Sequence, residues 1–332
     1  MQKRWIKRPI GSNWGDFGEH DQIGRLNLIT PERRLAALDE VQQGIAFSLS
    51  LPLDIPAAGL HPPHRHPPQL SWPKGQNVKV GDIFGDPSAI DIVNDDLVTM
   101  ALQYSTQWDS LAHIGAYFDA NDDGVAEPLF YNGYAGDFTA HGVRALGIEN
   151  VAVTCVQGRG VLVDLFSAYG TSGTLVDYDG LMSVFEQQRV VVSPGDILCL
   201  YTGFGDALMS AGKTPLAESV ESSYSTLKGS DARLLQWITD SGLAAICADN
   251  GAVENKPEGH KSGTAHCAPG GTFLPLHQHC LFKLGIPLGE LWYFKDLAET
   301  LRKAGRNRFL LTAPPLRLPG AVGAPVMPVG TI

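Results

Sequence analysis

The chain has 332 residues, of which 44% are hydrophobic and 18% are charged, and its formal net charge of −10 gives a sequence pI of about 5.4. Such a composition describes a globular protein with room for one α/β domain or two small ones, and its acidic balance excludes nucleic acid and anionic membranes as partners. No Cys-x-x-Cys pair, apolar signal segment or membrane-length apolar run is visible, so we expect a cytoplasmic protein.

The first quarter of the chain combines turns, one helix and a proline-rich segment. Thr30-Pro31 supplies a hydroxyl cap and a proline at the first helical position, and predicts a helix that continues to Gly44. Residues 1–45 therefore read as an N-terminal arm and helix. The proline-rich residues 52–80 predict an irregular loop that covers a pocket, from which His64 or His66 would contact the substrate.

Residues 103–113 concentrate the groups that catalysis needs, namely two amides, one carboxylate and one imidazole. Oxygen and nitrogen donors of this kind hold divalent metals or polarise substrates. If the stretch runs extended as far as Asp109, alternate side chains share one face. The side chains that would then point into one pocket are Gln103, Ser105, Gln107 and Asp109, with His113 following after a bend.

The middle of the chain alternates strands with helices, which favours an α/β core with some parallel pairing. We expect strands at 151–154, 160–165, 197–201 and 243–248, and helices at 177–188 and 230–240. The polar residues 251–271 read as a loop insertion without a catalytic role. The phosphate-binding glycine motifs and the Gly-x-Ser-x-Gly nucleophile motif are absent from the sequence.

A second polar cluster lies at residues 274–290, where His277 precedes Glu290 by thirteen positions. Only a fold-back of the chain would bring these two side chains together. Gln278 lies twelve positions before Glu290, and His279 is a third candidate, so the spacing leaves open which of the three faces a site.

Residues 103–113 resemble the signature of the cyclase-type metal-dependent hydrolase family, which includes kynurenine formamidase, isatin hydrolase and trans-dienelactone hydrolase. The family pattern is His-x-Gly-Thr-His-x-Asp-x-x-x-His. Thr106, Asp109 and His113 match it, whereas Gln103 and Gln107 replace its two earlier histidines. Further similar segments in the family's order extend the resemblance to roughly residues 12–330. They are Asn13-Trp14-Gly15, Leu26–Glu32, Tyr131–Gly133, His141-Gly142, Pro275–Glu290 and Phe309–Leu318.

The resemblance implies one swivelling β/β/α domain over residues 1–332, an α/β fold with a mixed sheet and flanking helices, in a homodimer or homotetramer. It also implies a metal held by Asp109, His277 and Glu290, with Gln103 in the first motif position, and a proton shuttle at His113. His141 either lines the pocket or packs near it. Three aromatic residues either form an apolar wall for a ring substrate or belong to the core: Trp14, Trp108 and Tyr131.

Gln103 and Gln107 affect which metal ion the site would suit, because an amide is a poorer zinc ligand than imidazole. The strong donors that remain are Asp109, His277 and Glu290. This set is rich in oxygen and suits manganese or magnesium better than zinc. Without any metal, Gln107 would donate to the substrate carbonyl while His113 and Asp109 activate water.

The resulting hypothesis is a hydrolase that opens a cyclic amide or lactone, or cleaves an aryl formamide, by metal- and histidine-assisted attack of water. The alternative is a catalytically reduced member that binds a small aromatic acid or carbonyl compound. In both cases the partner is a small molecule.

Overall fold

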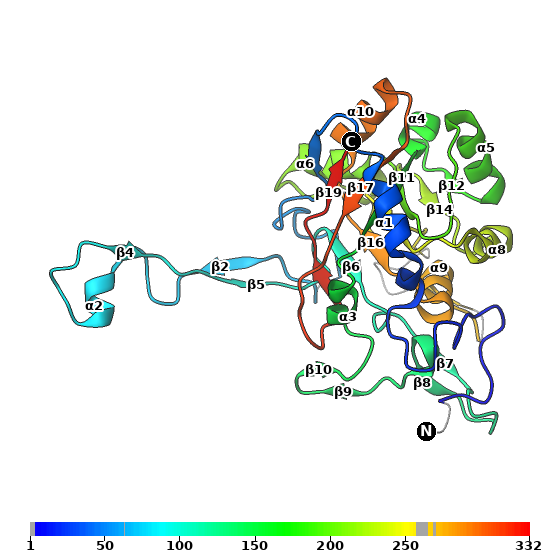
Figure 1. The fold of residues 1–332 in the computed structure, drawn as a ribbon, viewed down its shortest axis with the longest axis horizontal. Helices are drawn as coiled ribbons and strands as arrows, with labels where there is room; N and C mark the ends of the chain where they lie inside the picture. The colour runs from blue at the N-terminus through cyan, green and yellow to red at the C-terminus, as the bar shows by residue number, and fades with distance from the viewer. Residues whose placement is uncertain (1–3, 63, 257–264, 268–269) are drawn as a thin grey trace.

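A nine-stranded mixed sheet forms the centre of the molecule in this computed structural model, which describes residues 4–62, 64–256, 265–267 and 270–332 (Figure 1). Across the sheet the strands are β1 (Ala46–Ser48), β19 (Val329–Thr331), β17 (Arg308–Thr312), β11 (Gln157–Asp164), β13 (Ile197–Tyr201), β15 (Ala245–Ala248), β16 (Leu288–Glu290), β6 (Gln107–Asp109) and β18 (Gly323–Pro325). The pairs from β11 through β16 are parallel, and the outer pairs are antiparallel. The expected α/β fold with a mixed sheet is confirmed.

Helices cover both faces of this sheet, because successive strand residues point to opposite sides. Leu198 and Leu200 of β13 join one apolar core, whereas Ile197, Cys199 and Tyr201 join the other. The first core is covered by α5 (Tyr178–Gln188) and α8 (Ala232–Ser241), and the second by α3 (Ile148–Val153) and α10 (Lys295–Lys303). None of the helices in the described part of the chain is long and apolar enough to cross a bilayer.

Shorter elements complete the body. The helices are α1 (Pro31–Leu38), α4 (Leu165–Tyr169), α6 (Phe204–Ala211), α7 (Glu218–Glu221), α9 (Pro275–His277), the 3₁₀ turns η1 (Gly24–Leu28) and η2 (Tyr131–Gly133), and the π-helix η3 (Gln278–Leu284). The strand pairs are β7 (Ala116–Phe118) with β8 (Glu127–Leu129), β9 (Phe138–Thr139) with β10 (Gly142–Val143), and β12 (Leu175–Val176) with β14 (Thr226–Leu227).

Local sequence signals explain several of these elements. Thr30 caps α1 by accepting the Arg33 N–H, although the helix ends at Leu38 rather than near Gly44. Asp177 and Asp231 cap α5 and α8 in the same way. The strand expected at 151–154 is wrong, because Val151–Val153 belong to α3 and Thr154 is its C-cap. An apolar run of four residues does not distinguish a strand from a short buried helix.

Residues 67–100 form an arm that projects far from the body (Figure 1). It is an antiparallel ribbon in which β2 (Gln69–Ser71) pairs with β5 (Leu97–Thr99) and β3 (Val78–Lys79) pairs with β4 (Ile92–Val93). The short helix α2 (Val80–Phe84) lies at its tip. The loop expected at 52–80 therefore contributes its second half to a structured arm rather than to a lid over a pocket.

Asp249 is a buried carboxylate that holds the end of β15 to the start of α6. It accepts hydrogen bonds from the backbone N–H groups of Thr202 and Gly203 at 2.8 Å and from the Thr202 hydroxyl at 2.6 Å. Burial nevertheless raises the pKa of Asp249 to about 7.

We expect Asp249→Asn to lower the free energy of unfolding by about 1–3 kcal/mol at pH 8, because an amide nitrogen would replace an acceptor of these N–H groups. Urea denaturation measures the change. The matched control is Asp179→Asn on α5, whose carboxylate is exposed and pairs with Arg233. Equal loss of stability in both variants would contradict a special role for the buried carboxylate.

Candidate metal centre

Strand β6 presents Gln107 and Asp109 on one face of the sheet and Trp108 on the other. Its antiparallel neighbour β16 places Glu290 opposite Gln107. The Gln107 amide donates to Glu290 Oε2 at 3.2 Å, so the two side chains point the same way. Two strands from distant parts of the sequence thus bring their polar side chains to one buried point.

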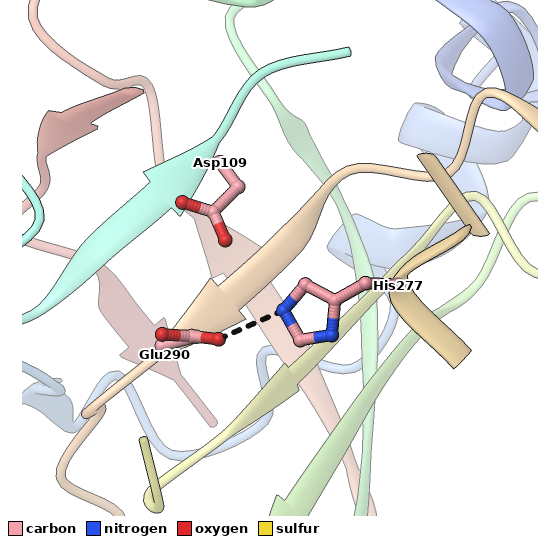
Figure 2. A group of neighbouring side chains, drawn as sticks. All are labelled: Asp109, His277 and Glu290. Carbon is pink, nitrogen blue, oxygen red and sulfur yellow. Dashed lines mark hydrogen bonds and ion pairs between the residues drawn. The ribbon is translucent and has the colours of Figure 1, made fainter. Parts of the chain in front are cut away.

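Three potential ligands meet there: Asp109, His277 and Glu290 (Figure 2). One donor atom from each lies within 4.8 Å of the others, and His277 Nε2 is 3.1 Å from Glu290 Oε1. His277 comes from the end of α9, and all three residues are buried. Two carboxylates and one imidazole form a donor set that suits a divalent metal ion.

Glu254 holds His277 from the opposite side of its ring. Glu254 Oε1 lies 2.8 Å from His277 Nδ1 and accepts the His277 backbone N–H, also at 2.8 Å, while Oε2 accepts the Leu276 N–H. The Glu254 side chain is buried. This arrangement orients the ring so that Nε2 faces Asp109 and Glu290.

Sequence reasoning missed Glu254, since residues 251–271 were expected to lack a catalytic role. Ten of its 21 residues, at 257–264 and 268–269, lie outside the described residues. Its described first part supplies the carboxylate that orients His277, so the expectation is corrected there. Nothing in the local sequence marks Glu254, because its partner is 23 residues away.

The three grouped side chains shift one another's pKa values. Burial raises the pKa of Asp109 well above its usual range, and the nearby Glu290 carboxylate adds to this effect. Burial opposes charge on His277, but its hydrogen bonds to Glu254 and Glu290 outweigh this and raise its pKa to about 10. Burial likewise opposes charge on Glu290, yet the interaction with His277 lowers its pKa. The site thus concentrates carboxylates that a cation would stabilise.

His113 stands beside the cluster, with Nε2 3.8 Å from Asp109 Oδ1. Burial lowers the pKa of His113 to about 4, so its ring is neutral at pH 7. A neutral imidazole next to a metal site can accept a proton from water or a substrate.

Gln103 lies in a turn and not in an extended strand, because β6 begins only at Gln107. The expectation that residues 103–109 alternate along one strand is therefore wrong. The Gln103 amide lies next to Gly323 of β18, the residue that pairs with Asp109, because a Cβ on Gly323 would lie 2.6 Å from Gln103 Nε2. The missing side chain of Gly323 makes room for this amide.

Unpaired buried atoms at the cluster test whether a metal fits. Within the described part of the chain, four side-chain atoms here have no hydrogen-bond partner: both Asp109 oxygens, Gln107 Oε1 and Gln103 Nε2. Buried polar atoms normally have partners. Three of the four are oxygens that would accept a cation, so the residues fit a divalent metal with Asp109, His277 and Glu290 as its ligands.

The proline-rich segment reaches the site through His61 and Arg65 rather than His64. His61 Nε2 lies 2.6 Å from the Tyr104 carbonyl oxygen, and Arg65 donates to the Gln103 carbonyl oxygen at 3.2 Å. Burial lowers the pKa of His61 to about 4. His64 and His66 are both exposed, and the expectation that one of them contacts the substrate stays a prediction.

The three aromatic side chains considered for a substrate wall lie in the core. Trp108 donates its Nε1–H to the Ala313 carbonyl on the far face of β6. Trp14 donates to the Phe282 carbonyl, and the Tyr131 ring packs against Gly285. All three are almost completely buried. The alternative that they are core residues therefore describes them better.

Two further candidate histidines, His141 and His279, lie away from the cluster. His141 is exposed in the turn between β9 and β10, with no contact to the cluster among the described residues. His279 Nε2 lies 2.9 Å from Thr239 Oγ1 on α8. Of the candidates His277, Gln278 and His279, only His277 has a side chain that meets Glu290.

Comparison with known proteins relates this geometry to one family. The family model for cyclases, Cyclase, matches residues 47–255. A solved structure described as a novel cyclase is 32% identical, with a TM-score of 0.75, and the match covers 97% of this chain and 99% of that chain.

Two other solved structures are less similar. Isatin hydrolase A from Labrenzia aggregata, bound to benzyl benzoate, is 11% identical, with a TM-score of 0.57 and coverage of 91% and 98% of the two chains. A "predicted metal-dependent hydrolase" from Bacillus stearothermophilus is 14% identical, with a TM-score of 0.50 and coverage of 87% and 98%. At these identities the likeness shows the fold alone. No curated protein matches the chain.

Proposed function

Because the chain belongs to the Cyclase family, we propose that it is a hydrolase that uses a divalent metal held by Asp109, His277 and Glu290. Its substrate would be a cyclic amide, a lactone or an aryl formamide. The observation that carries this proposal is the buried Asp109 carboxylate, whose two unpaired oxygens face an imidazole and a second carboxylate. Such a group is costly to bury unless a cation binds it.

The donor set favours manganese or magnesium over zinc. Two carboxylates and a single imidazole are ligands typical of harder ions, whereas zinc prefers several nitrogen or sulfur donors. A bound divalent ion at this point would polarise the substrate carbonyl and lower the pKa of water.

The residues around the cluster then have separate roles. His113, neutral at pH 7, accepts the proton that water gives up during attack and passes it to the leaving group. Gln107 donates to Glu290, and its buried Oε1 has no hydrogen-bond partner, so this oxygen is available to the metal or the substrate. The unpaired Gln103 Nε2–H is available to an oxygen of the substrate.

A cavity of about 190 Å³ lies behind Glu254, and Phe204, Tyr224 and Lys256 are among its walls. Asp109, His113, His277 and Glu290 do not line it. Glu254 binds Nδ1 of His277, on the side of the ring away from the cluster, so this cavity is separate from the proposed metal site.

The alternative is a protein that binds a small aromatic acid or carbonyl compound without turnover. Gln103 and Gln107, which replace the family's histidines, favour it, because fewer strong ligands weaken a catalytic metal. The two proposals differ in whether the protein holds a metal and turns over substrate.

One experiment separates them. The metal content of the purified protein is measured, together with turnover of isatin, N-formylkynurenine and dienelactones before and after chelation. One divalent ion per chain and chelator-sensitive turnover are the expected result. Turnover without metal would support a metal-free mechanism at His113, and neither metal nor turnover would support the binding protein.

Metal uptake should also release protons and strengthen as the pH rises. Without metal, His277 with its pKa of about 10 keeps a proton near neutral pH, and the raised pKa of Asp109 acts in the same direction. A metal needs both groups deprotonated. We therefore expect the Kd for the metal to fall between pH 6 and 8, with about one or two protons released per ion. Calorimetry in buffers with different ionisation enthalpies counts these protons. A Kd independent of pH would contradict this coupling.

A further inference from the structure

Arg65 places a positive charge beside a site that is otherwise rich in carboxylates. Its side chain is half-buried, and Nη1 donates to the Gln103 carbonyl oxygen at 3.2 Å. Burial raises the pKa of Asp109 and opposes charge on Glu290, and the charge of Arg65 acts against burial at both groups. The same charge adds to the effect of burial in lowering the pKa of His113. Arg65 therefore lies within electrostatic reach of the proposed metal centre and of its proton carrier.

Most hydrogen-bond donors of Arg65 are unused by the part of the chain that the structure describes. A guanidinium has five N–H donors, and the bond to the Gln103 carbonyl is the one that its side chain makes there. The nearby carboxylates do not take up the others. Both oxygens of Asp109 have no hydrogen-bond partner, and those of Glu290 contact Gln107 and His277. The cation thus has no carboxylate partner among the described residues.

Gln103 connects Arg65 to the metal centre. Its backbone carbonyl accepts from Arg65, while its side-chain amide lies next to Gly323 of β18, which pairs with Asp109. His61, four residues before Arg65, lies 2.6 Å from the carbonyl oxygen that follows, that of Tyr104. These two contacts hold Arg65 against the chain just before β6. A guanidinium fixed in this way loses little conformational entropy when it binds an anion.

We propose that Arg65 binds a carboxylate group of the substrate, away from the carbonyl that is hydrolysed. This inference rests on the proposed hydrolase function and narrows its substrate class. The substrate is an acid, namely a lactone, cyclic amide or aryl formamide that carries a free carboxylate besides the reacting carbonyl. Arginine suits this role because its planar fork donates two parallel N–H···O bonds to a carboxylate.

The charge of the protein makes such a cation important for an acidic substrate. The formal net charge of −10 repels anions at long range, and the carboxylates of Asp109 and Glu290 repel them within the site. Arg65 offsets this repulsion at the point where it lies. Dienelactones and N-formylkynurenine carry a carboxylate that would benefit, whereas isatin carries none. Arg65 therefore favours the first two compounds over isatin.

The test compares acids with their methyl esters, which keep the reacting bond and lose the charge. The pairs are a dienelactone with its methyl ester and N-formylkynurenine with its methyl ester. In the wild type, kcat/KM for the better acid should exceed that for its ester by about 10–100-fold. Arg65→Gln keeps an N–H donor for the Gln103 carbonyl but removes the charge, so this ratio should fall to near one, mainly through a higher KM for the acid. Arg65→Lys keeps the charge and should retain part of the preference.

Arg34→Gln is the matched control. Arg34 is also half-buried and also donates to a backbone carbonyl, that of Thr154 at 3.1 Å, but it lies on α1. This variant should keep the wild-type preference for the acid. A wild type that turns over acid and ester equally well would overturn the proposal, and so would an Arg65→Gln variant that keeps the preference.

A binding measurement gives a readout that needs no turnover. Calorimetry with benzoate and benzamide, on the protein as purified, should show tighter binding of benzoate to the wild type and a Kd about 10-fold higher in Arg65→Gln. Benzoate held by a metal instead would bind both proteins equally. That result, or a wild type that binds benzoate no better than benzamide, would overturn the proposal. Arg65-dependent binding of benzoate without turnover of any of the four compounds would reject the hydrolase and leave the carboxylate site standing.

Discussion

His113→Asn should lower kcat by about 10²–10⁴-fold while the metal content stays that of the wild type. Asparagine keeps a polar side chain of moderate size but accepts no proton near neutral pH. His113 lies 3.8 Å from Asp109 without being one of the three grouped ligands, so its loss removes proton transfer and leaves the metal in place. Steady-state kinetics on the best substrate, together with metal analysis of the same sample, measure both quantities.

His279→Asn is the matched control, because His279 is also a buried histidine whose pKa burial lowers to about 4. Its ring faces Thr239 on α8 rather than the cluster. We expect its kcat to stay close to that of the wild type. If His113→Asn retained full turnover, or lost its metal as well, His113 would not be the proton carrier of this site.

Glu254→Gln should weaken metal binding by about 10–100-fold. The carboxylate of Glu254 orients His277 through Nδ1 and makes its Nε2 a stronger donor. A glutamine keeps one acceptor oxygen but removes the charge, and its amide nitrogen cannot accept the Leu276 N–H that Glu254 Oε2 now accepts. Competition with a chromogenic chelator measures the Kd at fixed pH.

Glu40→Gln separates this effect from the general loss of a buried carboxylate. Glu40 is also buried, but it pairs with Arg306 and Arg308 far along the sheet from the cluster. Its variant is expected to keep the wild-type Kd for metal even if its stability falls. An unchanged Kd in Glu254→Gln, or an equal change in Glu40→Gln, would show that Glu254 does not act through His277.

Of the three grouped residues, the local sequence singled out only Asp109. Gln107 and Asp109 are two residues apart on one strand, so their side chains point to the same face of the sheet whichever way the strand pairs with its neighbours. The same alternation predicts that Trp108 points away from the site, and the structure places it in the core beside Trp292. The resemblance to the family supplied the distant partners, His277 and Glu290.

The sequence did not reveal Glu254 or the projecting arm. Glu254 acquires its role only through a contact with a histidine 23 residues away, across a polar stretch that reads as a loop. The arm is built from strands of two or three residues, which are too short for a clear period of alternation. Prolines in the same stretch favoured a loop, although they also occur at the ends of isolated ribbons.

Gln107 and Glu290, which join the two halves of the metal centre, are 183 residues apart in the chain. A ribosome that adds about 5–20 residues per second releases the first of these strands roughly 10–40 s before the second. During that interval β6 lacks both of its sheet neighbours, β16 and β18, and the Asp109 carboxylate stays hydrated. An ion at this site would therefore bind only after nearly the whole chain has been synthesised. The metals available to the newly finished protein, rather than those met by the growing chain, would then decide which ion binds.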